Sequence, residues 1–535
     1  MCGICGYAVL GPAGELPRPD AETVVRRMVG ALAHRGPDDR GGEPLDGRRV
    51  VLGHTRLSIL DLTPAGRQPM RDPVSDDRVV FNGEIYNFRA LRRDLERRGH
   101  TFASRGDTEV LLRSYAAEGL DAVARWRGMF ACVIWDASAR TLHLVRDRLG
   151  IKPLYYYRDG ARLLFASEVR ALLASGRVPL RLNREALATY LAFGSVQEPL
   201  TLVAGVYALQ PGHTLTLATG DLCEREYWDA ALAAGGGDGA VSSLATGAAG
   251  TKTEAGTEAA LLEVLRDAVG AHLVSDAPLG AFLSGGIDSG VVAALAREML
   301  PRRAHTFCVG FASGALDESE AAARAARRLG TDHRAIPVTR DEALATLPGF
   351  LAALDQPSFD GLNTYIVARA ARQAGVKVAL SGLGGDELFG GYPLFHQIPL
   401  LRRAQHAWSF APPPVQGAAG AVLRRTGRSD RHDRLAALFD LSSEPIEARG
   451  ARGARGPAHP YEVMRALLTP RRWEALLDGP VSPLDDDRYA AATRRRDAPP
   501  RRAAATRRRD APPRRAAASR GRGLWTPSTP SPISN

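Results

Sequence analysis

The sequence predicts an α+β domain, then an α/β domain with a parallel, doubly wound sheet, and finally a disordered basic tail. In residues 1–228, short apolar runs alternate with turn residues, which is typical of strands with a few helices packed on them. From residue 257, strand-like runs and helical stretches alternate, which favours parallel strands. Residues 481–535 are rich in Arg, Ala and Pro and repeat the segment TRRRDAPP, a composition that cannot form a core.

The first domain, residues 1–228, is expected to be rich in strands. Its apolar runs are VVLGHTRLSIL, RVVFNGEIYN, MFACVIWDA, TLHLVRDR and LLFASE. Outside these runs, helical stretches are expected over 21–33, 88–98 and 108–119. Residues 229–256 follow, and their content of Gly, Ala, Ser and Thr predicts a flexible linker or insert.

The second domain is expected to begin with an amphipathic helix over 258–273. The strand-like GAFLSGG, the helix GVVAALAREML and the strand HTFCVGF follow it. A helix over 318–329, the strand RAIPV, another helix and the strand VKVALSG continue the alternation. We place this domain at residues 257–480, because the composition changes abruptly near residue 480.

The net charge of the chain does not indicate a nucleic-acid partner. The 535 residues carry a formal charge of +11. Residues 488–522 contain 13 Arg and 2 Asp, so this tail segment accounts for the whole excess and the rest of the chain is neutral overall. No uncharged apolar run reaches the roughly 18 residues that span a bilayer. We therefore expect neither nucleic acid nor a membrane as partner.

The cysteines favour a reducing compartment. The five cysteines are odd in number and form no disulfide framework; they are Cys2, Cys5, Cys132, Cys223 and Cys308. No basic segment followed by an apolar segment marks a signal peptide. A cytoplasmic protein is expected.

The opening residues MCGICGY allow three interpretations: a redox CxxC motif, half of a zinc site, or a nucleophile that becomes the N-terminal residue. A redox motif needs a preceding strand, and a structural zinc site needs a second ligand pair; the sequence has neither. Removal of Met1 would expose Cys2, whose α-amine could act as the base for its own thiol. The alternative is that Cys2 and Cys5 are small residues filling a strand.

Three further motifs supply groups that a thiol nucleophile acting on an amide requires. FNGEIYN offers the Asn82 amide and the Gly83 N–H to an oxyanion, although an Asn-Gly turn alone would give the same pattern. Arg56 suits the α-carboxylate of an amino acid. Glu84 and Asp107 suit its α-ammonium, while Asp107 could equally cap the helix that follows it.

In the second domain, LSGGIDS follows a strand and opens a helix, so its backbone N–H groups would face an anion. It fits neither the Walker A motif nor the dinucleotide-binding fingerprint. Asp288 within it points to a metal ion between carboxylate and phosphate. SGLGGDELFGGY, at the end of a later strand, places two acids among five glycines and favours a binding site over a plain turn.

Taken in order, MCGICGY, HRGPDD, GHTRLSILD, FNGEIYNF and SRGDTEVLL resemble the glutaminase domain of the class II, N-terminal-nucleophile amidotransferases. The whole chain resembles the glutamine-hydrolysing asparagine synthetases. The resemblance implies a layered α/β/β/α fold for residues 1–228, with Cys2 as nucleophile and Asn82 and Gly83 as oxyanion hole. The glutamine-binding residues that it implies are Arg56, Leu57, Ser58, Ile59, Leu60, Asn82, Gly83, Glu84 and Asp107.

LSGGIDS resembles the pyrophosphate-binding loop of the ATP-pyrophosphatase fold. This resemblance implies ATP and Mg²⁺ as cofactors, with the metal held by Asp288 and Asp386. The ATP-binding residues that it implies are Leu283, Ser284, Gly285, Gly286, Asp288, Ser289, Val309, Ser381 and Gly382. The expected substrates are glutamine, ATP and aspartate, and the products are asparagine, glutamate, AMP and pyrophosphate. A homodimer is compatible with this family, and the sequence does not report the oligomeric state.

Two departures from the family pattern keep alternatives open. Leu383 stands where these synthetases commonly carry Glu, and no Lys follows Lys377. The domain at 257–480 is therefore expected to be incomplete at its C-terminal end, as a frame change near residue 480 would make it. The acceptor could be another carboxylate, in a secondary-metabolite or polysaccharide pathway. The chain could also be a glutaminase only, with an inactive synthetase domain, or a non-catalytic partner of another protein.

Overall fold

A computed structural model of the protein describes residues 1–9, 20–230, 254–300, 304–311 and 317–412, with the isolated residues 414–416, 418–419, 422 and 439. The expected tail at 481–535 and most of the expected linker at 229–256 lie outside the described residues. So does most of the second domain beyond residue 412.

The first of two six-stranded sheets is built around strand β1 (Gly3–Val9). All seven residues of β1 are buried, which suits its uncharged sequence GICGYAV. β1 pairs in antiparallel fashion with β3 (Val50–Arg56) on one side and with β9 (Arg162–Ala166) on the other. The outer strands of this sheet are β2 (Asp39–Leu45), β8 (Tyr155–Asp159) and β10 (Val206–Ala208).

The second six-stranded sheet has the neighbouring strands β5 (Arg78–Ile85) and β6 (Gly128–Asp136) on one side of its centre. These two strands are antiparallel, and Asn82 lies opposite Ala131. The other strands of this sheet are β4 (Met70–Arg71), β7 (Thr141–Arg146), β11 (His213–Ala218) and β12 (Asp221–Glu226).

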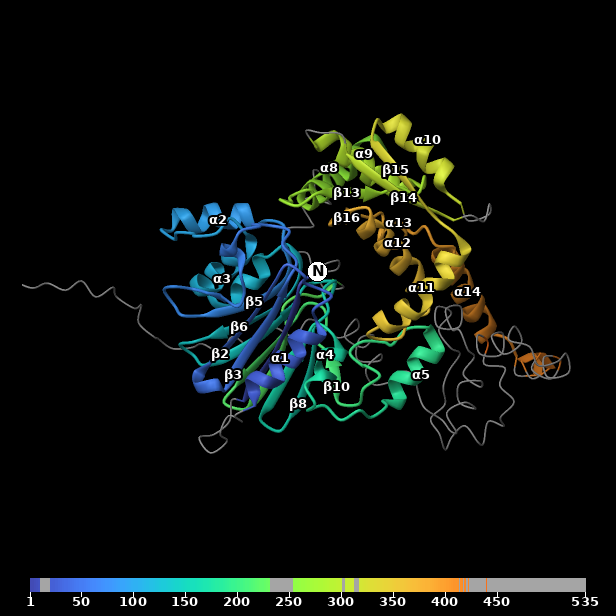
Figure 1. Ribbon diagram of the computed structural model, residues 1–535. Coiled ribbons are helices and arrows are strands. Elements are labelled where there is room, and N and C mark those ends of the chain that lie inside the picture. The colour runs from blue at the N-terminus through green and yellow to red at the C-terminus, as the bar shows by residue number, and fades with distance from the viewer. Residues whose placement is uncertain are drawn as a thin grey trace, which may run out of the picture. The chain divides into compact units, whose positions relative to one another are not determined.

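The two sheets pack face to face, and helices cover both outer faces (Figure 1). Alternation along β1 explains this packing, because Ile4 and Ala8 meet the second sheet while Cys5 and Tyr7 meet the helices. The first sheet is covered by α1 (Ala21–Ala31) and α4 (Val169–Ala174), and the second by α2 (Phe88–Arg97) and α3 (Asp107–Glu118). The expected α/β/β/α layering is confirmed for this domain.

Short helical elements connect these layers. They are η1 (Asp46–Arg48), η2 (Pro64–Gly66), η3 (Gly119–Arg125) and α5 (Arg184–Phe193). η2 follows the loop after β3, and that loop borders the site described below.

The second domain contains a four-stranded sheet in which every strand pair is parallel. Its order is β15-β14-β13-β16, so the chain adds strands on one side of β13 and then returns to its other side. The strands are β13 (Leu279–Phe282), β14 (His305–Phe311), β15 (Asp332–Val338) and β16 (Val378–Leu380). The reversal of order beside β13 is the place where ligands bind in open α/β sheets. The expected parallel sheet is confirmed.

Helices connect the parallel strands, as crossover connections require. The connecting helices are α9 (Ile287–Met299), α10 (Ser319–Leu329), α11 (Arg340–Ala353) and α12 (Leu362–Gln373). Helix α8 (Glu254–His272) precedes β13, and α13 (Gly385–Phe389) and α14 (Leu394–Ser409) follow β16. A small core of Leu283, Ala293, Cys308, Ala322 and Ala326 joins α9 and α10 to the sheet.

Several expected boundaries differ from the structure. The helix expected over 108–119 begins at Asp107, and Gly106, not Asp107, is its N-cap, so the capping alternative for Asp107 is wrong. The helix expected to begin at residue 258 begins at Glu254, so the expected linker ends three residues earlier than its limit of 256. Helix α1 ends two residues before the expected end at 33, and α2 ends one residue before 98. Such ends depend on local capping, which apolar spacing does not report.

Within the described ranges, no helix combines the length and apolar character that crossing a bilayer would need.

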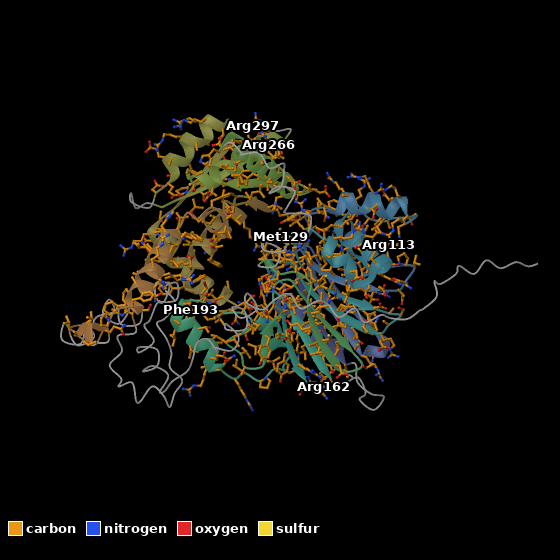
Figure 2. All side chains as sticks on the ribbon, turned by 180° about the vertical axis from the view of Figure 1, so that it is seen from behind. Arg113, Met129, Arg162, Phe193, Arg266 and Arg297 are labelled. Carbon is orange, nitrogen blue, oxygen red and sulfur yellow. The ribbon has the colours of Figure 1, made fainter. Side chains whose placement is uncertain are left out.

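A buried ion pair joins α3 to the turn after β4 and yields a stability prediction. The Arg113 guanidinium donates to both carboxylate oxygens of Asp72, at 3.0 and 3.1 Å, and both side chains are buried. Figure 2 labels Arg113. Arg113→Met should lower the free energy of unfolding by about 3–5 kcal/mol, because it leaves a buried carboxylate without its partner. Urea denaturation followed by tryptophan fluorescence measures the change.

The matched control is Arg324→Met, which removes an exposed i,i+4 pair with Glu320. Because exposed pairs contribute little, this variant should unfold at the wild-type urea concentration. Equal effects of the two substitutions would contradict the role given to the Arg113–Asp72 pair.

Candidate active site

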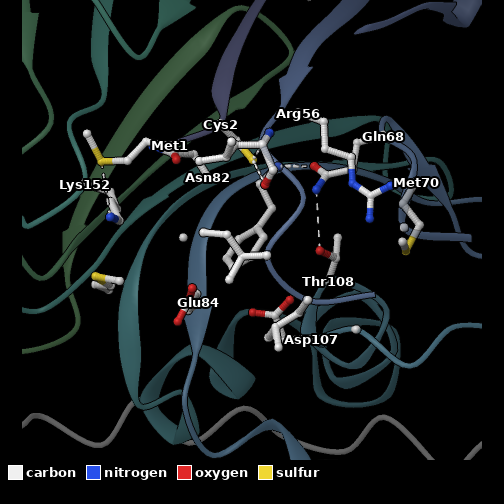
Figure 3. A pocket seen from close by; sticks show the side chains of 18 of the residues that line it. Met1, Cys2, Arg56, Gln68, Met70, Asn82, Glu84, Asp107, Thr108 and Lys152 are labelled. Carbon is white, nitrogen blue, oxygen red and sulfur yellow. Dashed lines mark hydrogen bonds between the residues drawn. The ribbon is translucent and has the colours of Figure 1, made fainter. Parts of the chain in front are cut away.

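One pocket of the first domain gathers most of the residues expected to bind glutamine (Figure 3). Eight of the nine expected residues line it: Arg56, Leu57, Ile59, Leu60, Asn82, Gly83, Glu84 and Asp107. Cys2 lines it as well. Ser58 is not among the lining residues; its backbone N–H donates to the Asp38 carboxylate at 2.8 Å instead.

Cys2 enters the pocket from the head of β1. The burial of the seven residues behind it fixes where its thiol lies. The Leu57 backbone N–H donates to the Cys2 sulfur at 3.4 Å, and the Cys2 carbonyl accepts from the Arg35 guanidinium at 2.9 Å. Burial raises the pKa of the Cys2 thiol, while the Leu57 N–H and the positive charge of the N-terminus oppose that shift. The thiol therefore needs a base to become a nucleophile.

Asn82 has the properties expected of an oxyanion donor. It lies on β5, its side chain is buried with 1% exposure, and its amide nitrogen has no hydrogen-bond partner. A buried amide N–H without an acceptor costs free energy, and such orphaned groups in native proteins call for an explanation. Figure 3 shows this side chain beside Cys2. An oxyanion formed by attack of the thiol would supply the acceptor that Asn82 lacks.

Gly83, the next residue, must be glycine because β6 approaches it closely. A Cβ atom at this position would lie 2.2 Å from the Met129 carbonyl oxygen and 2.6 Å from the Phe130 Cα. Without a side chain, the Gly83 backbone is left open to a ligand in the pocket.

Glu84 and Asp107 place two carboxylates on one side of the pocket (Figure 3). The Asp107 carboxylate accepts from the Ile85 N–H at 2.9 Å, which holds the start of α3 against the end of β5. Burial raises the pKa of Asp107 to about 6. Burial, together with the neighbouring Asp107, raises the pKa of Glu84 to about 7. A ligand cation between the two carboxylates would stabilise their ionised forms and lower both pKa values.

Arg56 is buried at the end of β3 and lines the pocket. Its guanidinium donates to the carbonyl oxygens of Asp61 and Thr63, the latter at 2.9 Å. These bonds close the loop that follows β3, so the guanidinium is held in place before any ligand arrives. A pre-organised fork of this kind suits a carboxylate.

Lys152 and Arg35 belong to this site, and neither was among the expected site residues. Lys152 lines the pocket and is buried, with 7% exposure. Arg35 lies within the quoted motif HRGPDD, but nothing in that motif indicates that it would bond to the Cys2 carbonyl. The composition could have drawn attention to Lys152, because only 3 of the 70 Lys and Arg residues are lysines.

In the second domain, the residues expected to bind ATP lie where parallel strands end. Leu283 and Ser284 follow β13, Ser381 follows β16, and Val309 lies on β14. The Ser284 and Ser289 hydroxyls bond at 2.8 Å, and the Ser284 N–H donates to the same Ser289 oxygen at 3.1 Å. This pair closes the loop on the first turn of α9, whose N-cap is Gly286.

The two loops of this domain meet at Asp288. A Cβ atom on Gly385 would lie 2.4 Å from the Asp288 carboxyl carbon, so the aspartate side chain rests on the Gly385 backbone. Asp386, the other expected metal ligand, lies against Gly391, where a Cβ atom would collide with its carboxylate. Across the part of the chain that the structure describes, no cluster of three or more His, Cys, Asp or Glu side chains could hold a metal. Two carboxylates fit a magnesium ion only if phosphate oxygens supply further ligands.

Comparisons with known proteins give two family matches. Residues 1–228 match the family described as glutamine amidotransferase domain. Residues 260–511 match the family described as asparagine synthase.

Relatives resemble the chain across both domains. Asparagine synthetase (glutamine-hydrolyzing) 1 of Bacillus subtilis is 35% identical over 460 residues, which cover 83% of this chain and 68% of that protein. A putative asparagine synthetase (glutamine-hydrolyzing) of Mycobacterium bovis is 36% identical over 79% of this chain and 65% of its own length. Amidase chry2 of Gibberella zeae is 32% identical over 76% of this chain and 62% of its own length. The chain spans about two thirds of the length of these relatives.

The contact between Asp288 and Gly385 predicts the outcome of a glycine substitution. Gly385→Ala should weaken ATP binding at least about tenfold, because the added methyl would displace the carboxylate where the two loops meet. The matched control is Gly290→Ala, since a Cβ on that glycine of α9 meets nothing within 4 Å. Calorimetric titration with ATP and magnesium measures both. Equal affinity of the two variants for ATP would contradict the placement of the nucleotide at these loops.

Proposed function

This chain belongs to the family of glutamine-hydrolysing asparagine synthetases, and on that basis we propose that it transfers the amide nitrogen of glutamine to aspartate at the expense of ATP. The products are asparagine, glutamate, AMP and pyrophosphate. The observation that carries the proposal is the buried Asn82 amide, which has no acceptor and lies beside the Cys2 thiol.

The first half-reaction takes place in the Cys2 pocket. After Met1 is removed, the Cys2 α-amine takes the thiol proton and the sulfur attacks the side-chain amide carbon of glutamine. The oxyanion that forms accepts hydrogen bonds from the Asn82 amide and the Gly83 N–H. The proton passes to the amide nitrogen, the carbon–nitrogen bond breaks, and ammonia leaves. Water then hydrolyses the glutamyl thioester to glutamate.

Substrate selection follows from the charged groups around Cys2. The α-ammonium of glutamine lies between Glu84 and Asp107, and its α-carboxylate meets the Arg56 guanidinium. Asp107 and Arg56 are held by the fold, through the bonds of Asp107 to Ile85 and of Arg56 to Asp61 and Thr63. Because these side chains are already ordered, they lose little conformational entropy when glutamine binds, and this lowers the free-energy cost of binding.

The second half-reaction uses the loops that follow β13 and β16. The backbone N–H groups of Gly285 and Gly286 and the N-terminus of α9 bind the ATP phosphates. Asp288 and Asp386 would hold a magnesium ion, which neutralises charge on the departing pyrophosphate. The aspartate β-carboxylate attacks the α-phosphorus, pyrophosphate leaves, and ammonia then displaces AMP from the acyl adenylate.

Two observations bear on the identity of the acceptor. Leu383, at the position where these synthetases commonly carry Glu, is 89% exposed and contributes no polar side chain to the nucleotide loop. One relative of comparable identity is named an amidase. Aspartate is the acceptor that the names of the Bacillus and Mycobacterium relatives favour, and another carboxylate is the alternative outcome of the experiment below.

The experiment compares two nitrogen donors in one assay. Pyrophosphate release is followed with ATP, magnesium and aspartate, in the presence of either glutamine or ammonium. Cys2→Ala should abolish glutamine-dependent release and leave ammonium-dependent release unchanged, because ammonium bypasses the thiol. Asn82→Ala should reduce the glutamine-dependent kcat by about 10²–10³-fold and likewise leave the ammonium reaction unchanged.

Different failures in this assay have different meanings. Glutamate formation without pyrophosphate release from aspartate would leave a glutaminase whose acceptor is a different carboxylate or whose synthetase domain is inactive. Retention of glutamine-dependent activity by Cys2→Ala would exclude the proposed nucleophile.

Glutamine affinity should depend on pH through Glu84 and Asp107. Both acids have raised pKa values, about 7 and about 6, so both are ionised above pH 7 and become protonated as the pH falls. Only the ionised carboxylates attract the α-ammonium, so affinity is highest above pH 7 and is lost below it. Calorimetric titration of Cys2→Ala with glutamine should show Kd rising about tenfold or more between pH 8 and pH 5.5.

The same titration of a Cys2→Ala, Glu84→Gln double variant is the control. Its Kd should be higher at pH 8 and should change less with pH, because one of the two titrating groups is gone. A Kd for Cys2→Ala that stays constant from pH 8 to pH 5.5 would contradict the placement of the ammonium.

A further inference from the structure

Lys152 is a buried cation in the glutamine pocket to which the proposed mechanism gives no role. It lines the pocket with Cys2 and Glu84 and is only 7% exposed. The chain contains 67 Arg and 3 Lys, so its positive charges are almost always guanidinium groups. The buried Lys152 therefore places a positive charge in the pocket beside Cys2.

The loop that carries Lys152 is held rigidly. Asp147, whose side chain is fully buried, accepts backbone N–H groups at 3.0–3.1 Å; the donors are Phe130, Leu149, Ile151 and Lys152. The Lys152 carbonyl in turn accepts from the Arg146 guanidinium at 3.0 Å. The backbone at Lys152 is thus fixed through both its N–H and its carbonyl group, which sets the position from which its side chain enters the pocket.

The ammonium of Lys152 points toward the start of the chain. Its nitrogen lies 3.3 Å from the Met1 sulfur (Figure 3). Among the described residues, no carboxylate lies within 4.0 Å of this nitrogen. A thioether is a weak acceptor, and Met1 is the residue whose removal the mechanism requires. Once Met1 is removed, the Lys152 charge faces the new N-terminus without this contact.

We propose that Lys152 is a positioning residue that acts through the α-amine of Cys2: its charge keeps that amine neutral and thus able to accept the thiol proton. The proposal rests on the proposed function for the identity of the base. A neutral amine is the form that can act as a general base, and a nearby cation disfavours protonation of an amine.

Several charged groups lie near the α-amine, and we compare their effects on its protonation with that of Lys152. The charged groups that face the N-terminus and the thiol are Arg35, Asp38, Arg56, Asp107 and Lys152. Glu84 and Asp147 act on the Lys152 ammonium itself and favour its charged form. Arg35 has the same sign as Lys152, but its guanidinium already forms an ion pair with Glu168 at 2.8 Å. Burial lowers the pKa of the Met1 α-amine to about 6, Arg35 and Lys152 act in the same direction, and the Cys2 thiolate and Asp38 oppose them. When Met1 is removed, the amine moves by one residue and stays within this set of charges.

The test measures the pH dependence of glutamate formation in the full-length chain, as kcat at saturating glutamine from pH 6 to pH 9. Saturation removes the effect that Lys152 has on glutamine binding through the neighbouring Glu84. Lys152→Met removes the charge and keeps much of the side-chain volume. Its acid limb should move upward by about one pH unit. Activity should therefore fall about tenfold at pH 6.5 and stay within about twofold of the wild type at pH 8.5. Lys152→Arg, which keeps the charge, should retain the wild-type pH profile.

Arg148→Met is the matched control. It removes a positive charge from the same loop, but Arg148 lies over the Trp228 ring and does not line the pocket. Its pH profile should superimpose on that of the wild type. A Lys152→Met profile that keeps the wild-type shape, whether unchanged or lowered by one factor at every pH, would overturn the proposal.

A second measurement separates this inference from the proposed function. The rate at which iodoacetamide alkylates Cys2, read from the mass of the N-terminal peptide, should show the same upward displacement in Lys152→Met. If the wild type forms no glutamate but this displacement occurs, the proposed function fails and the role of Lys152 stands. Equal alkylation profiles overturn the role of Lys152 alone. Lys152→Gln replaces Lys152→Met in both measurements if the latter does not fold.

Discussion

The burial of β1, a strand of the first sheet, between the second sheet and a helical layer is the constraint on which the site depends. A nucleophile at the end of a chain would ordinarily be mobile, because terminal residues lack neighbours on one side. Here the seven residues after Cys2 are all buried, with Ile4 and Ala8 packed on the second sheet and Cys5 and Tyr7 on the helices. The strand therefore fixes Cys2 at the rim of the pocket, where the Leu57 N–H and the Arg35 guanidinium hold it on either side.

Around this fixed point, the fold places charge where water is largely excluded. Glu84, Asp107 and Lys152 are each costly to bury, and burial shifts the pKa of each toward its neutral form. A zwitterionic substrate with an ammonium and a carboxylate can offset part of that cost. Binding of the substrate thus offsets part of the cost of burying these groups, and the Asn82 amide gains an acceptor when an oxyanion forms. The polar groups of the pocket therefore have better partners when the substrate reacts than when the pocket is empty.

Much of this arrangement could be predicted from the sequence, because short motifs carry local chemistry. The nucleophile, the Asn-Gly pair and the acidic residues stand in recognisable segments, and alternation with turn residues was enough to predict a sheet-rich domain. The role of Lys152 could not be predicted, since it depends on a loop folded around Asp147 and on the distance to a terminus about 150 residues away. The sequence could not decide between the two roles open to Asp107, because its bond to the Ile85 N–H joins residues 22 positions apart. Leu383 is described by the structure and is exposed, whereas the second domain beyond residue 412 lies almost entirely outside the described residues, so the absence of a lysine after Lys377 is an observation on the sequence alone.

The most direct test of the account is the intact mass and N-terminal peptide of the purified chain after exposure to an electrophilic glutamine analogue, a diazoketone. The account predicts that Met1 is absent, that one adduct is present, and that it resides on the N-terminal Cys2, with excess glutamine slowing its formation. Retention of Met1, or an adduct on the exposed Cys223 that glutamine does not slow, would contradict the claim that Cys2 is an N-terminal nucleophile in a glutamine site.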